Sequence, residues 1–528
     1  MVITEIKATL TQIIISFDLK DDVRAVIRET VPTISEKQGR TLFIAECEIK
    51  GGTAAIEIER FDGGHDRLFS EFSAFVENER LGGARYVTEI ADDVPSNRLP
   101  YPQPSIIKTM SCGRDDAKAL GIKQKLFNIN LPAIMAAAPR GDEIAFEHCG
   151  KTYWFLKERI DGLDAQIREC DELGLTVTLI LLNSPKRFGS TNEKALLESC
   201  IHPGFDWNYP DAYISAFDMR TEEGQGYYRA FCEFLAARYT RLDRKYGCVS
   251  GFIISNEVDS QYVWGNAGEM TVEAYTREYT QAMRLAWLCA RKHCAHFRVY
   301  ASLDHLWGIR HMPTFPLRTY TARSVIDNIN AHSLRDGNFP WNVAFHPYPE
   351  DLRWPNFWND RSADFAFTTQ RITFRNMEVL PAYLAQEQLL YKGVPRRIIF
   401  SEQGFNSLSG PLGPLTEAMA EAAYVLAYLK ARAIDTVDMM MHHSYLDNPH
   451  EFGLNLGIRR YDPSKPDKVG EPKPIYEAVR DMDTEREPAR TAKARAYIGG
   501  ELFDYLLNPP EIAGDPVHDP NAPPAFGG

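Results

Sequence analysis

Two glutamates follow closely after apolar runs of the sequence, at positions where a carboxylate can do acid–base chemistry. Glu257 comes after residues 249–255, and Glu402 comes after residues 396–401. If these runs are the fourth and seventh strands of a parallel barrel, their carboxyl ends face each other across its mouth. Hydrolysis of a glycosidic bond needs two carboxyl groups, one to protonate the leaving oxygen and one to attack, or to activate water against, the anomeric carbon. The pair predicts carbohydrate cleavage, and ordinary surface glutamates at loop starts are the alternative.

The elements that must position this pair begin near residue 106, where apolar runs alternate with helical patterns. Near-continuous apolar runs are typical of parallel strands that are buried on both faces. The rhythm predicts an α/β fold, a (β/α)8 TIM barrel, with an antiparallel insertion at 143–148 and 151–155. An open doubly wound sheet is the alternative, but the glycine-rich phosphate loop that it calls for does not occur. The eight runs are 121–129, 176–182, 212–217, 249–255, 298–303, 342–345, 396–401 and 436–442.

Three segments of different character make up the chain. Residues 1–105 have short β-like runs bounded by turn residues, which predicts an N-terminal all-β, sandwich-like domain. A proline-rich connector at 95–104 leads into the predicted catalytic barrel of residues 106–485. Residues 486–528 are expected to form a C-terminal helix followed by a poorly ordered tail rich in proline and glycine.

The residues around the two glutamates resemble those of a known superfamily. Asn256-Glu257 after the fourth run and Glu402 after the seventh are similar to the strand-end motifs of clan A glycoside hydrolases, the retaining (β/α)8 superfamily. The resemblance implies that Glu402 is the nucleophile and Glu257 the general acid/base. It also implies that Asn256 hydrogen-bonds the sugar 2-hydroxyl. His346-Pro347-Tyr348 resembles a His-x-Tyr motif after strand six, whose tyrosine holds the nucleophile's carboxylate.

Two further comparisons refine the resemblance. The order of β domain and barrel, with Asp66-Arg67-Leu68 and Arg85-Tyr86-Val87, resembles an uncharacterised family suggested to contain glycoside hydrolases. Many clan members carry a tryptophan after strand eight, where this chain has His442-His443-Ser444-Tyr445. Tyr445 or a histidine is therefore the candidate substitute, and the sugar, the linkage and exo or endo action stay open.

Other aromatic and polar residues near predicted strand ends are candidates for sugar binding. Indole faces stack on the apolar faces of sugar rings, and Trp264, seven residues beyond Glu257, is the first candidate for such a platform. Packing of a loop onto the barrel is the alternative for each tryptophan, and a structural position behind the site is the alternative for each histidine. The full set of predicted substrate-binding residues is Asn256, His346, Tyr348, Trp264, His305, Trp307, Asn130, His442 and Tyr445.

Two other function classes stay open beside the glycosidase prediction. Asp304-His305, His346 and His442-His443 would allow a metal-dependent barrel hydrolase. Such barrels usually carry His-x-His at the end of the first strand, and the first run here ends without a histidine. We therefore expect no metal and no other cofactor. A non-catalytic carbohydrate-binding barrel is the third class, and the presence of both glutamates argues against it.

Composition limits the partners. The chain has 528 residues with 72 acidic and 59 basic side chains, a formal net charge of −13, which argues against a nucleic-acid partner. No apolar stretch is long enough to predict a membrane span.

The cysteines and the first residues bear on the cellular compartment. The nine cysteines include no Cys-x-x-Cys pair and indicate a reduced compartment. The first residues lack a signal-peptide pattern, which favours the cytoplasm, whereas an upstream signal already removed would mean a secreted or periplasmic protein. The oligomeric state is not predicted.

Overall fold

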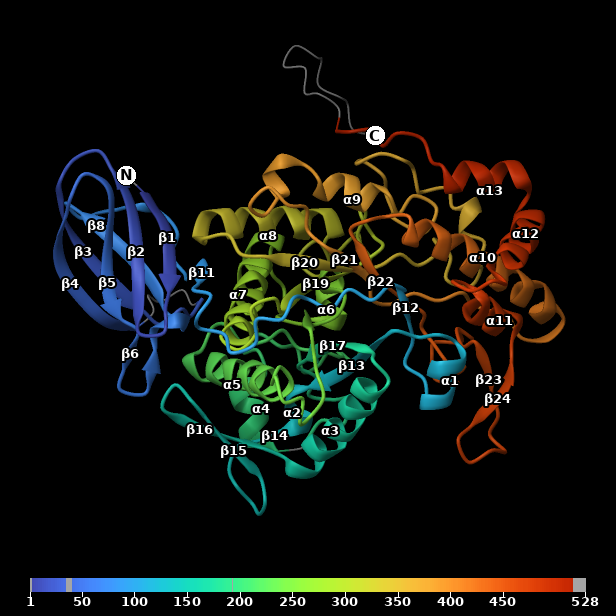
Figure 1. Ribbon diagram of the computed structural model, residues 1–528, viewed down its shortest axis with the longest axis horizontal. Coiled ribbons are helices and arrows are strands. Elements are labelled where there is room, and N and C mark those ends of the chain that lie inside the picture. The colour runs from blue at the N-terminus through green and yellow to red at the C-terminus, as the bar shows by residue number, and fades with distance from the viewer. Residues whose placement is uncertain (1, 35–39, 192, 516–528) are drawn as a thin grey trace, which may run out of the picture.

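A closed barrel of parallel strands forms the centre of the molecule (Figure 1). The computed structural model describes residues 2–34, 40–191 and 193–515. The first and last barrel strands pair with each other, with Lys108 opposite Met440, which closes the sheet. The fold class predicted from the sequence is confirmed. In barrel order the strands are β12 (Lys108–Thr109), β13 (Gln124–Asn130), β17 (Thr176–Leu182), β18 (Gly251–Ile254), β19 (Arg298–Asp304), β20 (Trp341–His346), β21 (Ile398–Phe400) and β22 (Val437–Met441).

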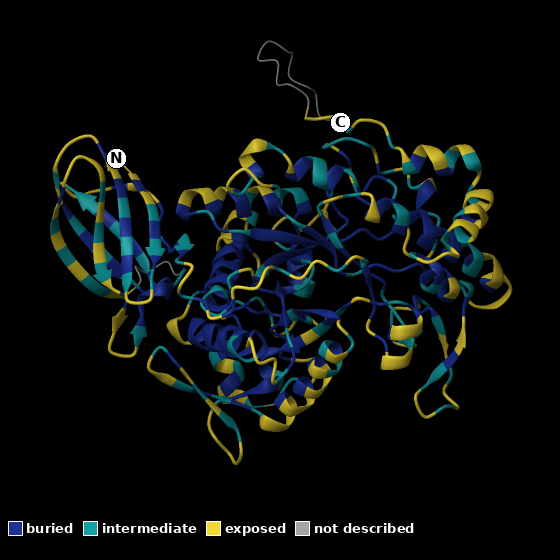
Figure 2. Cartoon of the chain, viewed as in Figure 1, coloured by how far each residue is buried: buried dark blue, intermediate teal, exposed yellow. Residues whose placement is uncertain are grey.

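Helices cover the outside of the barrel, so both faces of its strands are buried. Figure 2 shows these strands almost entirely in dark blue. The interior is filled by a separate apolar cluster that includes Ile253, Tyr300 and Met439 from three different strands. The longer helices are α3 (Lys157–Glu172), α5 (Glu222–Tyr239), α7 (Val272–Arg291), α8 (Ala322–Asp336) and α10 (Gly413–Arg432). The shorter ones are α1 (Arg114–Ala119), α2 (Leu131–Ile134), α4 (Lys194–Cys200), α6 (Gln261–Trp264), α9 (Val379–Leu384) and α11 (Pro474–Asp481).

The strand count was right, but one predicted strand does not exist and one real strand was missed. Residues 212–217 form no strand and take part only in isolated bridges, such as the one between Ser215 and Asn266. The true first strand, β12, has two residues, which is too short to produce an apolar run. Both errors lie before β18 in the chain. They therefore cancel in the strand numbering from β18 onward. The runs before Glu257 and Glu402 are indeed the fourth and seventh strands.

The N-terminal residues form a β module at one side of the barrel (Figure 1). Inward-facing residues alternate with outward-facing ones along its strands, as in β2, where Ile13, Ile15 and Phe17 are buried. This alternation confirms the predicted β domain. One sheet contains β1 (Val2–Ala8), β2 (Gln12–Leu19), β5 (Gly52–Glu59), β10 (Gly82–Gly83) and β11 (Glu89–Ile90). The other contains β3 (Val23–Thr30), β4 (Thr41–Ile49), β8 (Glu71–Val76) and β9 (Glu79–Arg80), and β6 (Phe61–Asp62) pairs with β7 (His65–Asp66).

Smaller additions extend the barrel. The predicted insertion is a sheet of β14 (Met135–Ala136), β16 (Lys151–Phe155) and β15 (Ile144–His148), and β23 (Arg459–Tyr461) pairs with β24 (Val469–Pro472). The chain ends in α12 (Glu487–Ile498) and α13 (Gly500–Leu507). Beyond them, the Ala513 N–H donates to the Phe365 carbonyl at 2.9 Å, and residues 516–528 of the predicted tail lie outside the described residues. Within the described chain, no helix combines the length and the apolar character needed to cross a membrane.

Candidate active site

Both glutamates lie at the carboxyl ends of their barrel strands. The turn after β18 places Ser255 and Glu257 at φ values of 62° and 37°, a left-handed backbone that is uncommon outside glycine and clusters at functional sites. The Glu257 N–H donates to the Ser302 hydroxyl at 3.1 Å, which ties this turn to the neighbouring strand β19. After β21, the Gln403 side chain donates to the Met441 carbonyl at 2.7 Å and anchors the turn that carries Glu402.

Two residues at the end of β20 connect to the glutamates: His346, the last residue of the strand, and Tyr348, two residues beyond it. His346 Nδ1 lies 2.8 Å from a carboxylate oxygen of Glu257, and its Nε2 lies 3.1 Å from the Ser401 hydroxyl. The Tyr348 hydroxyl donates to a carboxylate oxygen of Glu402 at 3.0 Å. One side-chain atom each from Glu257, His346 and Glu402 lies within 4.8 Å of the other two. Three strand ends thus bring two carboxyl groups, an imidazole and a phenol into one site.

The surroundings of Glu257 favour its protonated form. Burial raises the pKa of Glu257 to about 7, the negative charges of Asp304 and Glu402 raise it too, and the hydrogen bond from His346 opposes them. Burial alone would lower the pKa of His346, but its contact with Glu257 and the nearby acidic charges raise it to about 9. At neutral pH the imidazole is therefore positively charged, and Glu257 is close to its titration midpoint.

Behind Glu257 lies a second pair of acidic residues. Asp304, at the end of β19, is 7% exposed, and its N–H donates to the Asp259 carboxyl group at 3.0 Å. Burial opposes the ionisation of Asp304, but contacts with His305 lower its pKa, whereas burial and the charge of Asp304 raise the pKa of Asp259 well above its ordinary value. Asp304 is thus the charged member of the pair and Asp259 the neutral one. Sequence reasoning missed Asp259, Ser302 and Ser401, whose only signal is their position within five residues of a strand end.

In the segment after β22, the charge of Glu402 acts on His443, whereas the predicted binding set named His442 and Tyr445. His443 Nε2 lies 3.3 Å from Glu451, and the charges of Glu451 and Glu402 raise the pKa of His443 although its burial would lower it. His442 is 1% exposed, and its Nε2 lies 3.1 Å from the Leu456 carbonyl. Burial lowers the pKa of His442 to about 3, so this histidine is a neutral core residue.

The Tyr445 hydroxyl bonds the first helix and neither glutamate. It donates to Asp116 on α1, and the same carboxylate accepts from the Tyr476 hydroxyl at 2.6 Å and from Arg459 at 3.2 Å. This arrangement uses the Tyr445 hydroxyl to fix the strand-eight loop to the first helix. Among His442, His443 and Tyr445, the charge of Glu402 shifts the pKa of His443 alone.

The remaining predicted binding residues divide into two groups. Trp307 is fully buried with its indole N–H on the Phe367 carbonyl at 2.8 Å, so it has no free ring face for a sugar. Asn130 is 2% exposed, and its amide group donates to the Ser184 carbonyl and accepts from the Ser184 N–H.

The second group consists of two partly exposed residues, Trp264 and Asn256, and one buried residue, His305. Trp264 is partly exposed and packs against Tyr213 with ring centroids 5.1 Å apart, and Asn256 is partly exposed beside Glu257. His305 is 8% exposed and bonded to Asp304.

The cluster of Glu257, His346 and Glu402 is also the arrangement that a metal ion would need. In the described part of the chain, it is the one group of three acidic, histidine or cysteine residues whose ligand atoms approach closely enough. Metal binding requires a neutral imidazole nitrogen with a free lone pair. Both His346 nitrogens have hydrogen-bond partners, and the raised pKa of His346 favours its charged form. The observed contacts therefore suit a charged imidazole that is hydrogen-bonded to Glu257 better than a metal ligand.

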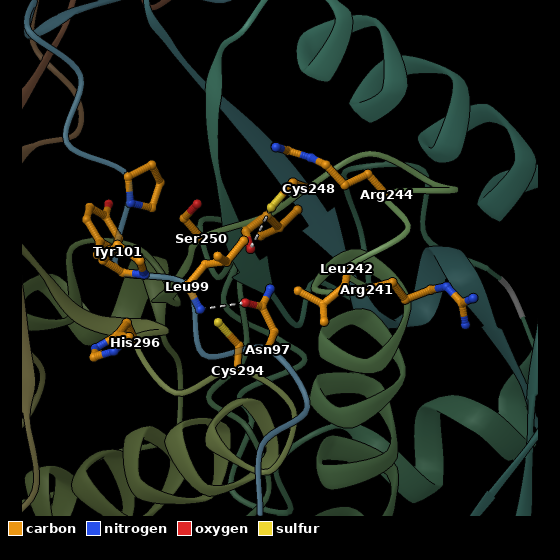
Figure 3. A pocket seen from close by; sticks show the side chains of 13 residues that line it. Asn97, Leu99, Tyr101, Arg241, Leu242, Arg244, Cys248, Ser250, Cys294 and His296 are labelled. Atoms are coloured by element: carbon orange, nitrogen blue, oxygen red, sulfur yellow. Dashed lines mark hydrogen bonds between the residues drawn. The ribbon is translucent and has the colours of Figure 1, made fainter. Parts of the chain in front are cut away.

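A separate apolar pocket lies at the other end of the barrel. Figure 3 shows Leu99 and Tyr101 of the connector among the residues that line it, together with Cys248 and Cys294, which precede β18 and β19. Segments that precede barrel strands lie at their amino ends, so this pocket of about 120 Å³ is remote from the two glutamates.

Comparison with solved structures finds glycoside hydrolases. A family 39 glycoside hydrolase from the gut symbiont Bacteroides cellulosilyticus WH2 has a TM-score of 0.43 at 11% identity, over 92% of this chain and 83% of that one. A family 1 β-glucosidase from Thermotoga maritima has a TM-score of 0.41 at 12% identity, over 70% and 84%. An exo-β-1,4-mannosidase from Opitutaceae bacterium strain TAV5 has a TM-score of 0.41 at 16% identity, over 76% and 63%. These values are too low to assign an activity to this chain.

Comparison with protein families gives a direct match. Among curated proteins, the sequence search finds no match. One family model aligns with residues 100–505, which include the whole barrel and α12. That match covers well over half of the chain, and the chain therefore belongs to the family of unknown function DUF5722.

Proposed function

We propose that this protein is a retaining glycoside hydrolase in which Glu402 is the nucleophile and Glu257 the general acid/base. The observation that carries the proposal is the pairing of two strand-end glutamates, each with its own fixed partner. Glu257 has His346 at 2.8 Å, and Glu402 has Tyr348 at 3.0 Å. A carboxylate oxygen of each lies within 4.8 Å of the other. Retaining enzymes separate the two carboxyl groups by about 5 to 5.5 Å and inverting enzymes by about 6.5 to 9.5 Å. A close approach of one oxygen from each group is what the shorter separation requires, and in this sense it supports retention.

The first step would form a glycosyl ester on Glu402. The Glu402 carboxylate attacks the anomeric carbon while the bond to the leaving oxygen breaks, and Glu257 gives that oxygen its proton. The raised pKa of Glu257 supports this role, because an acid with a pKa of about 7 is still substantially protonated at neutral pH. Tyr348 holds the attacking carboxylate in position, and its own pKa is raised well above the ordinary value by burial and by Glu402, so it remains a donor.

The second step would reverse the role of Glu257. Formation of the ester removes the charge of Glu402, which is one of the causes that raise the pKa of Glu257. The pKa of Glu257 then falls, and its carboxylate can take a proton from the water that attacks the ester. His346 helps this step because its positive charge stabilises the ionised form of Glu257.

Sugar contacts would come from residues around the pair. We propose that Asn256 hydrogen-bonds the 2-hydroxyl, that Trp264 offers a stacking face, and that His443 takes the place of the tryptophan found after strand eight in many clan members. His305 and His346 are the remaining candidates from the predicted set. The substrate is therefore a carbohydrate, an oligosaccharide or a polysaccharide. A carbohydrate-binding barrel without turnover is the second candidate, since the same residues would hold a sugar.

A panel of aryl glycosides and of plant, algal and host glycans tests the activity. Glu402→Ala serves as the blank, because it removes the proposed nucleophile and leaves the rest of the mouth unchanged. Turnover by the wild type and none by Glu402→Ala is the expected result. Tight glycan binding without turnover across the whole panel would favour the binding protein, and equal turnover by both proteins would remove Glu402 from the site.

A further inference from the structure

Several aromatic side chains reach the surface in the long segment between β17 and α5 and in the segment that follows β18. Phe188 and Trp207 are exposed, and Tyr213 and Trp264 are partly exposed. The rings of Tyr213 and Trp264 pack against each other with centroids 5.1 Å apart. Apolar side chains that gather at a surface mark binding sites, and flat aromatic faces suit sugar rings. We call these four residues the aromatic surface.

Hydrogen bonds connect this surface to the turn that carries Glu257. The hydroxyl of Ser255, two residues before Glu257, donates to the Trp264 carbonyl at 3.1 Å. The Tyr213 N–H donates to the Val263 carbonyl at 2.9 Å. Because β17 and β18 pair with each other in the barrel, the segments that follow them are neighbours at its carboxyl end. The aromatic surface therefore borders the barrel mouth on the side of the proposed acid/base.

Two positive charges without an acidic partner lie among these rings. The guanidinium carbon of Arg187 is 3.6 Å from the centroid of the Tyr213 ring. The Arg187 side chain is exposed, and in the described part of the chain it forms no ion pair. The Lys186 ammonium group donates to the carbonyls of Trp207 and Tyr209, at 3.4 and 3.2 Å, and not to a carboxylate. Both cations are thus available to an anionic ligand.

Backbone contacts fix the position of Arg187. The Ser184 hydroxyl accepts from the Arg187 N–H at 3.0 Å and donates to the Tyr213 carbonyl at 2.5 Å. The amide group of Asn130, the last residue of β13, donates to the Arg187 carbonyl at 3.2 Å. Asn130, which the sequence predicts to bind the substrate, is therefore placed to position the loop that carries this arginine. A loop that is already held in place loses little conformational freedom when a ligand binds.

We propose that the aromatic surface binds an acidic glycan, with the Arg187 guanidinium on the carboxylate of a uronic acid unit or on the sulfate of a sulfated unit. This inference rests on the proposed function, because it names the substrate class of the same barrel mouth. Arginine pairs two N–H groups with two oxygens of such an anion, which gives both charge and direction to the contact. Stacking on Tyr213 orients the guanidinium, and Trp264 offers a ring face to the sugar. A neutral glycan would use the aromatic faces and leave Arg187 without a partner.

Binding of matched polysaccharides tests the proposal. Glu402→Ala, which lacks the proposed nucleophile, is titrated calorimetrically with polygalacturonate and alginate, each beside its methyl ester, and with a sulfated galactan beside its desulfated form. We expect the acidic member of at least one pair to bind about tenfold or more tighter than its neutral partner, since hydrogen bonds to charged groups are worth that much. The pair that is discriminated tells carboxylate from sulfate. Equal binding of both members in every pair, or binding of none, would overturn the proposal.

A variant assigns the preference to one side chain. Arg187→Gln in the Glu402→Ala protein removes the charge of an exposed residue, so the preference for the acidic member should fall about tenfold. Arg241→Gln is the matched control, because Arg241 is also exposed but pairs with Asp243 and lines the pocket at the other end of the barrel. An unchanged preference in Arg187→Gln would overturn the assignment. An equal fall in both variants would overturn it too, because it would trace the preference to overall charge.

This binding test does not depend on turnover. Preference for an acidic glycan without hydrolysis by the wild type would contradict the glycosidase proposal and leave the Arg187 site standing. Hydrolysis of neutral glycosides without any preference for acidic glycans would support the glycosidase and overturn the Arg187 site.

Discussion

The imidazole of His346 joins two strand ends, with Nδ1 at 2.8 Å from Glu257 and Nε2 at 3.1 Å from the hydroxyl of Ser401, the residue before Glu402. Because the ring is positively charged at neutral pH, it favours the ionised form of Glu257 and limits how far the pKa of that residue is raised. A single histidine therefore helps set the proton on the proposed acid while it positions the turn that carries the proposed nucleophile.

Replacement of His346 should shift the pH profile to the alkaline side. His346→Gln removes the positive charge, so the pKa of Glu257 should rise above its present value of about 7. Since kcat/KM falls as the free enzyme's acid loses its proton, the basic limb of its pH profile should move to higher pH. The measurement is kcat/KM for an aryl glycoside between pH 4 and 10. An unshifted basic limb would show that His346 does not act on the titrating acid.

Replacement of Asp304 should shift the same limb in the opposite direction. The charge of Asp304 is, after burial, the largest cause that raises the pKa of Glu257. Asp304→Asn keeps the shape but removes the charge, so the acid should lose its proton at lower pH and the basic limb should move toward acid. Asp327→Asn is the control, because Asp327 lies on α8 and its hydrogen-bond partner is Tyr383, away from the pair. A shift toward higher pH in Asp304→Asn would contradict the electrostatic account.

Loss of the Tyr348 hydroxyl should slow the reaction without changing the fold. Tyr348→Phe removes the hydrogen bond to Glu402, and removal of one preorganised donor typically costs about 100-fold or more in rate. Steady-state kinetics and a thermal melt would measure both effects. Tyr445→Phe is the control, since the Tyr445 hydroxyl bonds Asp116 instead. An equal loss of activity in both variants would mean that Tyr348 has no special role.

The two glutamate variants should differ in how they respond to leaving groups. Glu402→Ala should lose several orders of magnitude in rate with every substrate. Glu257→Ala should lose least with substrates whose leaving group needs no proton, and added azide should restore turnover by attacking the glycosyl ester in place of water. Wild-type activity in either variant would remove that residue from the mechanism, and loss of azide rescue would contradict the role of Glu257.

Sequence reasoning located the proposed catalytic pair because its signal is local. Apolar strands that end in Asn256-Glu257 and in Ser401-Glu402 can be recognised without knowing how the loops pack. The strand count survived two errors because the missed strand β12 and the false strand at 212–217 both precede β18. A two-residue strand has no periodicity, so its place in the barrel follows only from its pairing with β13 and β22.

Side-chain direction beyond the strand ends could not be predicted in the same way. Trp307 and Tyr445 both follow strands, yet one lies in the core and the other bonds α1, because loop packing decides which way each side chain points. Asp259 is buried by the short turn that follows Glu257, and its neutral state depends on Asp304 from another strand. Such charges depend on contacts between distant segments, which a single sequence does not show.

The stereochemistry of the product tests the central proposal most directly. An active aryl glycoside from the panel would be hydrolysed in an NMR tube, and the anomeric proton of the first-formed sugar would be followed before mutarotation. Double displacement through Glu402 predicts a product with the same anomeric configuration as the substrate. A first-formed product of inverted configuration would contradict it, because inversion requires water, not Glu402, to attack the anomeric carbon.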